Sequence, residues 1–148
     1  MYKNILVAID DSETSRSALA EAKHIANASQ AKLYIVHVVD EVLLNMHGHA
    51  MLDMGGADSA VANLRRAGET LLANAMQDVA GINAEPVLVE AQKRRVSETL
   101  AEKAKELNVD LIVIGRHSQR GLATLILGSV AEQLAKIAEA SVLLVRKH

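Results

Sequence analysis

The sequence of 148 residues contains no cysteine, tryptophan or phenylalanine. Without cysteine there is no disulfide framework, no thiolate zinc site and no cysteine nucleophile. Its two tyrosines, Tyr2 and Tyr34, are too few to bind single-stranded nucleic acid by stacking bases on aromatic rings. The 16 basic and 18 acidic residues give a net charge of −2. Because no basic surplus exists to neutralise a phosphate backbone, we expect no nucleic-acid partner.

Long hydrophobic runs are also missing. No apolar stretch approaches the roughly 20 residues that a membrane span needs. The chain enters a short apolar segment directly after Met1–Asn4, and this segment is too short for the core of a signal peptide. We therefore expect a cytoplasmic protein with no membrane partner. Half of the residues are apolar, so residues 1–148 can form a single domain that buries a full core without metals.

Short apolar runs alternate with longer amphipathic segments along the whole chain. The pattern predicts strands at residues 5–9, 33–39, 86–89, 111–114 and 142–145. It predicts helices at about 12–29, 61–79 and 96–107, and a fourth that opens at Gly128-Ser129 and turns Val130, Leu134 and Ile137 inward. The alternation indicates an α/β fold: one doubly wound, five-stranded parallel sheet with helices on both faces, Rossmann-like in architecture. The first and fourth strands are the most uniformly apolar and should lie in the middle.

Three single residues carry local predictions. Pro86, the only proline, cannot donate to a ladder and favours an edge position for the third strand. Gly68 interrupts a helix at a cost of about 1 kcal/mol against alanine, which indicates that something packs close to it. His37 lies within an apolar strand, and a buried histidine with a satisfied hydrogen bond is the favoured interpretation.

Polar residues follow the two central strands directly. In such sheets a ligand binds outside the carboxyl ends of the strands, where the strand order reverses. Asp10 and Gly115 are expected there. Gly115 would let a ligand approach the backbone, and the helix after Gly128-Ser129 offers free amides and a favourable dipole to phosphate. The segment between them adds four donors to an anion: Arg116, His117, Gln119 and Arg120. The alternative is a solvated loop followed by an ordinary serine cap.

The same residues resemble the universal stress protein family over nearly the whole chain. Lys3 to Ser12 is similar to the family's first strand and aspartate loop, and His37-Val38 to the end of its second strand. The segments 110–115 and 127–130 resemble its last half. Nucleotide-binding members have a glycine, two residues, a glycine, nine residues, then a glycine with serine or threonine. Ser118 stands here at the second glycine, and Ala131 replaces a hydroxyl residue.

The resemblance implies a fold like that of the adenine nucleotide alpha hydrolases and a cofactor, ATP or AMP, with or without magnesium. The nucleotide would contact, by the resemblance and the donor pattern together, Ala8, Ile9, Asp10, Val38, Ile114, Gly115, Arg116, Ser118, Gln119, Gly128, Ser129 and Val130. Relatives form homodimers through the last strand, so the resemblance also implies a homodimer through Val142–Val145. The expected role is a stress-response regulator acting on a protein partner that the sequence does not identify.

Other interpretations remain open at this point. If Ser118 closes the site, the protein is a nucleotide-free dimeric scaffold. A slow nucleotide hydrolase is the third hypothesis, although the sequence contains no P-loop lysine and no residue placed as a general base, so we expect no catalytic residues. Lys93-Arg94-Arg95 is either a solvated loop or an anion contact. The segment 46–54 holds two histidines, three methionines and an aspartate, but no spacing in it matches a known metal signature, and we expect no metal site.

Overall fold

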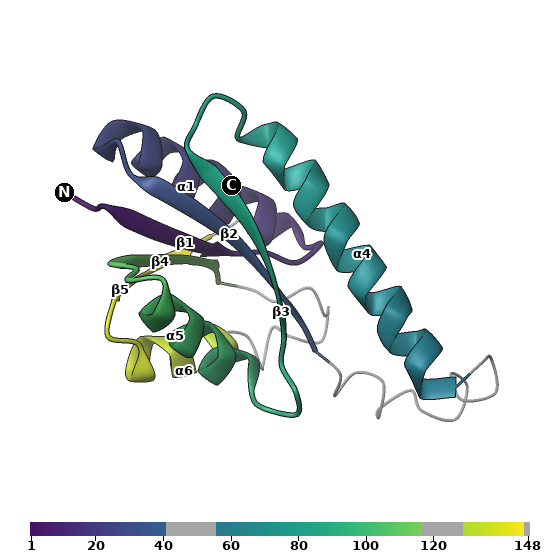
Figure 1. Cartoon of the computed structure of the whole chain (residues 1–148). Helices are drawn as coiled ribbons and strands as arrows, with labels where there is room; N and C mark the ends of the chain where they lie inside the picture. The colour runs from purple at the N-terminus through teal and green to yellow at the C-terminus, as the bar shows by residue number, and fades with distance from the viewer. Residues whose placement is uncertain (41–55, 117–128, 147–148) are drawn as a thin grey trace.

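The computed structural model describes residues 1–40, 56–116 and 129–146 (Figure 1). Strands and helices alternate within these ranges. The strands are β1 (Asn4–Ala8), β2 (Lys32–Val39), β3 (Ala84–Glu90), β4 (Leu111–Gly115) and β5 (Ser141–Val145). The helices are α1 (Glu13–Ser29), α4 (Gly56–Asp78), α5 (Val96–Glu106) and α6 (Ser129–Ile137).

The strands form one parallel sheet in the order β3-β2-β1-β4-β5. Helices α1 and α4 cover one face of the sheet, and α5 and α6 cover the other (Figure 1). This confirms the predicted doubly wound fold with five parallel strands. It also confirms the central place of the first and fourth strands and the edge position of the strand that holds Pro86.

Both faces of the central strands are buried, which explains their uninterrupted apolar sequence. In β1, Ile5 and Val7 pack into the cluster under α1 and α4, while Leu6 packs into the cluster under α5 and α6. All three are 0% exposed. Full burial of each such side chain stabilises the fold by roughly 1.5–3 kcal/mol. The position of β1 in the sheet is therefore determined from both sides.

Asp110 fastens the amino end of β1 beside β4. Its two carboxylate oxygens accept from the backbone N–H of Lys3 at 2.9 Å and of Asn4 at 3.1 Å. The Asn4 side chain donates in turn to the backbone carbonyl of Asn108 at 3.1 Å. These bonds satisfy backbone groups at the start of the central strand and hold the sheet together at the end opposite to the candidate site.

The prediction that Ile137 faces inward is wrong. Val130 is half-buried and Leu134 is fully buried, but the side chain of Ile137 is 47% exposed. Ile137 is the last residue of α6, and this helix covers the outermost part of the sheet, so its final turn has few neighbours. Within the described ranges, no helix combines the length and the hydropathy needed to cross a bilayer.

Candidate functional site

The carboxyl ends of β1 and β4 lie side by side at the point where the strand order reverses. Ala8 pairs with Ile114 as the last register pair of the two strands. Ile9 and Asp10 continue from one strand, and Gly115 and Arg116 from the other. The two ends are adjacent because β1 and β4 are parallel neighbours, and the chain leads from β1 to β2 on one side and from β4 to β5 on the other, which defines the switch point. The predicted neighbourhood of Asp10 and Gly115 is therefore found in the structure.

A closed set of hydrogen bonds holds the loop after β1. The backbone N–H of Asp10 donates to Ser15 Oγ at 2.8 Å, and Asp10 Oδ1 accepts from the backbone N–H of Ser12 at 2.9 Å. Ser12 is the N-cap of α1, and its Oγ accepts from the backbone N–H of Ser15 at 3.1 Å. Ser15 is buried, with 4% of its surface exposed. The half-buried Asp10 carboxylate is thus fixed in direction, with Oδ1 engaged by the turn.

Gly115 is needed for the packing of α1 on β4. A Cβ placed on Gly115 would lie 3.0 Å from the backbone C, the backbone O and the Cβ of Thr14. The absence of a side chain therefore lets the first turn of α1 approach the end of β4. The sequence pattern led us to expect a ligand near this glycine, and the group that approaches it in the structure is Thr14. No pattern in the sequence marks Thr14 and Ser15 except that both are small polar residues directly after the cap.

The second strand contributes Val38 and His37 to the same edge. Val38 is half-buried, like Ala8 and Asp10, whereas Ile9 and Ile114 are buried. His37 Nδ1 lies 2.8 Å from the backbone carbonyl of Ile9. This confirms that the histidine has a hydrogen-bond partner, the residue that precedes Asp10. The prediction that the histidine is buried is wrong, because His37 is half-buried at the end of the sheet.

The amino end of α6 reaches the edge from the other face of the sheet. Val130, in its first turn, is half-buried, and Ala131 is buried in the hydrophobic cluster between the sheet and helices α5 and α6. Ser97 on α5 is 1% exposed, and its Oγ donates to Gln133 Oε1 at 2.8 Å, which ties α6 to α5. The helix therefore holds a fixed position. Three of the predicted contact residues, Ser118, Gln119 and Gly128, lie outside the described residues.

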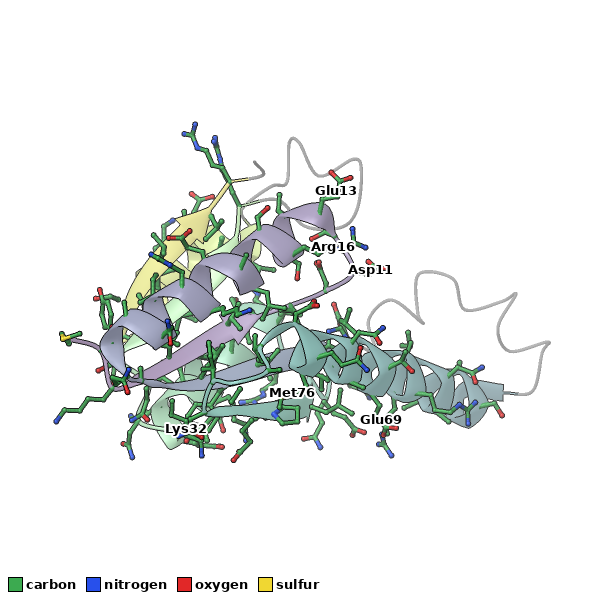
Figure 2. The ribbon with its side chains drawn as sticks, turned by 90° about the horizontal axis from the view of Figure 1, so that it is seen from above. Asp11, Glu13, Arg16, Lys32, Glu69 and Met76 are labelled. Carbon is green, nitrogen blue, oxygen red and sulfur yellow. The ribbon has the colours of Figure 1, made fainter. Side chains whose placement is uncertain are left out.

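Arginines and acidic residues follow the carboxyl ends of β1 and β3. Figure 2 shows Asp11, Glu13 and Arg16 gathered at the start of α1, far from Lys32 at the other end of the sheet. After β3, Arg94 forms an ion pair with Glu102 of α5, and this hydrogen bond raises the pKa of the Arg94 guanidinium above its ordinary value. Arg95 lies 3.9 Å from Glu98 on the same helix. Both arginines are thus directed toward α5, which favours the solvated-loop interpretation of this turn.

A metal centre has no support among the described side chains. No three histidine, cysteine, aspartate or glutamate residues of the described ranges gather closely enough to hold an ion. The histidine- and methionine-containing segment 46–54 lies outside those ranges.

The topology is that of a Rossmann-like α/β protein, with the switch point of its sheet between β1 and β4. The model of the universal stress protein family matches residues 1–146, and the chain belongs to that family. The universal stress protein YxiE of Bacillus subtilis is 32% identical over 151 residues, covering 99% of this chain and 100% of the relative.

Solved structures share the fold of this chain. A universal stress family protein from Burkholderia pseudomallei is 33% identical with a TM-score of 0.72, covering 97% of this chain and 95% of that one. A universal stress protein in complex with cAMP is 24% identical with a TM-score of 0.69, covering 99% and 98% of the two chains. The Archaeoglobus fulgidus universal stress protein in complex with dAMP is 20% identical with a TM-score of 0.65, covering 97% and 98%.

Proposed function

We propose that this protein binds an adenine nucleotide, ATP or AMP, at the carboxyl ends of β1 and β4. The observation that supports the proposal is that β1 and β4 end side by side at the switch point of the sheet, with Asp10 in the loop after β1 and Arg116 directly after β4. Two universal stress proteins with the same fold have been solved with cAMP and with dAMP. Both ligands are adenine nucleotides.

The chemistry of the edge residues fits such a ligand. Ala8 and Val38 are half-buried and offer apolar surface to a base. The Asp10 carboxylate is an acceptor for a ribose hydroxyl or an adenine amino group. Arg116 and the amino end of α6 supply positive charge and backbone donors for phosphate. A magnesium ion, where the ligand is ATP, would be held by the phosphates and through water by Asp10.

The first test is the nucleotide content of the purified protein. Denaturation followed by anion-exchange chromatography and mass spectrometry should release ATP, ADP or AMP in stoichiometric amount. Protein that is empty, and stays empty after incubation with magnesium and ATP, would contradict the proposal and favour the nucleotide-free scaffold. Added ligand at 100 times its Kd should stabilise the fold by about 2.7 kcal/mol, which raises Tm by roughly 5–11 °C.

The role of Asp10 is tested by Asp10→Asn. Asparagine keeps an oxygen that accepts from the Ser12 N–H, so the turn is preserved and the negative charge is lost. We expect nucleotide affinity to fall roughly tenfold, because a hydrogen bond to a charged acceptor is replaced by a neutral one. Asp11→Asn is the matched control, since Asp11 is an exposed neighbouring carboxylate. Equal losses in both variants would contradict a specific contact at Asp10.

We further propose that the protein forms a homodimer through Val142–Val145 and regulates a protein partner in the stress response. β5 is an edge strand of the sheet, and its Leu144 side chain is 44% exposed. A bare apolar edge favours pairing with another chain. Light scattering at micromolar concentration should give twice the monomer mass, and Leu144→Lys should give a monomer. Ala135→Lys, on the exposed side of α6, should leave the dimer intact. A monomeric wild-type protein would refute this part of the proposal.

A further inference from the structure

We propose that His37 is a positioning residue: its imidazole fixes the spacing between the ends of β1 and β2, and thereby the relation of Asp10 to Val38. The inference rests on the proposed function, because these two residues are the predicted nucleotide contacts of the two strands. It adds a residue that does not itself contact the ligand. Its evidence is a side-chain hydrogen bond at the end of the ladder and a glycine that makes room for the ring.

The imidazole bonds to β1 at the last position of the β1–β2 ladder. Their register ends with Ala8 paired to Val36, and the backbone N–H of Ile9 donates to the Val36 carbonyl at 2.9 Å. In a continued parallel ladder the Ile9 carbonyl would accept from the backbone N–H of Val38. His37 Nδ1 lies 2.8 Å from that carbonyl. Because a carbonyl only accepts, Nδ1 must carry the proton and donate it.

The bond therefore joins the residue before Asp10 to the residue before Val38. Any change in the ring position moves the end of β1 relative to the end of β2. Asp10 itself is hydrogen-bonded to Ser12, the N-cap of α1, and to Ser15 in the first turn of that helix. The histidine is thus a side-chain link between this turn and the second strand.

Gly68 of α4 holds the ring from the other side. A Cβ on Gly68 would lie 2.7 Å from His37 Cδ2 and 2.9 Å from Leu88 Cδ1. Both distances are shorter than real Cβ contacts, so the ring and Leu88 would have to move. Helix α4 packs on β2 and β3 (Figure 1). Gly68 itself is buried. This confirms the predicted close approach and gives its reason: the missing side chain leaves the space that the imidazole occupies.

The test compares His37→Asn with His37→Leu. Asparagine places an amide nitrogen at nearly the position of Nδ1 and can still donate to the Ile9 carbonyl. Leucine fills similar space without a donor. We expect His37→Asn to bind ATP or AMP within about twofold of the wild type, and His37→Leu to bind about tenfold more weakly, as for the loss of one hydrogen bond. His24→Leu, at an exposed histidine of α1, should leave affinity unchanged.

Gly68→Ala provides an independent test of the same contact. The added methyl group displaces the ring from a distance of 2.7 Å, so affinity should fall in the same direction as in His37→Leu. The double variant Gly68→Ala with His37→Asn should recover part of the loss, since the smaller side chain leaves room for the methyl group. Asn74→Ala, at an exposed position of the same helix, is the control for changed helix propensity.

Asp110→Ala is the control that distinguishes a positioning role of His37 from a general contribution to stability, because this variant weakens the opposite end of β1. All affinities are measured by titration calorimetry below the unfolding transition. Equal affinity losses in Asp110→Ala and His37→Leu, or failure of His37→Asn to retain binding, would overturn the proposal. If the wild type binds no nucleotide, the proposed function fails separately. The position of the turn is then read from the amide chemical shifts of residues 9–12: these must change in His37→Leu and stay near wild type in His37→Asn, and any other result overturns the role of His37.

Discussion

Replacing Gly115 with alanine tests whether α1 and β4 meet as closely as the structure indicates. The new Cβ would lie 3.0 Å from three atoms of Thr14, two of which belong to the backbone. Backbone atoms at a helix start cannot rotate away, so the first turn of α1 has to shift by a few tenths of an ångström. Overpacking of this kind costs about 1–3 kcal/mol. For a chain of this length the loss corresponds to a fall in Tm of roughly 2–12 °C.

Chemical denaturation monitored by circular dichroism measures this loss directly. Ser141→Ala, at an exposed position of β5, serves as the control and should stay within about 0.5 kcal/mol of the wild type. The shift of α1 also stretches the bond from the Asp10 N–H to Ser15 Oγ, now 2.8 Å. Nucleotide affinity should therefore fall together with stability. A Gly115→Ala protein with wild-type stability would refute the proposed packing of Thr14 on this glycine.

Two further predictions concern hydrogen bonds at the two ends of β1. Ser15→Ala should destabilise the fold by about 1–3 kcal/mol in urea denaturation, because the Asp10 N–H loses its buried acceptor; an unchanged midpoint would show that water replaces the hydroxyl. Asp110→Ala should cost roughly 2–3 kcal/mol by the same assay, since two backbone N–H groups lose a charged acceptor. Asp110→Asn, which keeps one acceptor oxygen, should lose about half as much, and equal losses in both variants would contradict the two-bond geometry.

The fold was predictable because it depends on local apolar patterns. Strands buried on both faces read as continuous apolar runs, and the one at residues 111–114 was placed to within a residue of β4. The proline at position 86 marked the edge strand for a reason that involves its own backbone alone. The helical pattern gave a wrong prediction for Ile137, which it placed on the inward-facing side of its helix. A helical period predicts which side of a helix faces inward, but it contains no information on how far the covering elements extend.

Hydrogen-bond and packing partners that lie far apart in the sequence were not predictable from the sequence alone. The hydrogen bonds between Asp110 and the start of β1 span 106 and 107 positions in the sequence, and no sequence feature near Asp110 predicts them. The hydrogen-bond acceptor of His37 was not predictable for the same reason. The pattern indicated a buried, hydrogen-bonded histidine, but the identity of the acceptor depends on where the ladder between β1 and β2 ends. Gly68 similarly predicted a close approach, but the sequence did not indicate that the imidazole of His37 is the approaching group.

These packing roles change what a motif glycine means in this fold. Gly115 matches the first glycine of the nucleotide-binding pattern, yet Thr14 requires its missing side chain whether or not a phosphate lies nearby. A nucleotide-free scaffold with the same helix packing would need this glycine as much as a nucleotide-binding protein does. Gly115 therefore cannot distinguish the two functions. Asp10 can, because its turn needs only an oxygen that accepts from the Ser12 N–H, which asparagine also supplies. Because Asp10→Asn keeps this acceptor and Asp11→Asn controls for the loss of a neighbouring charge, an affinity loss confined to Asp10→Asn would reflect the ligand.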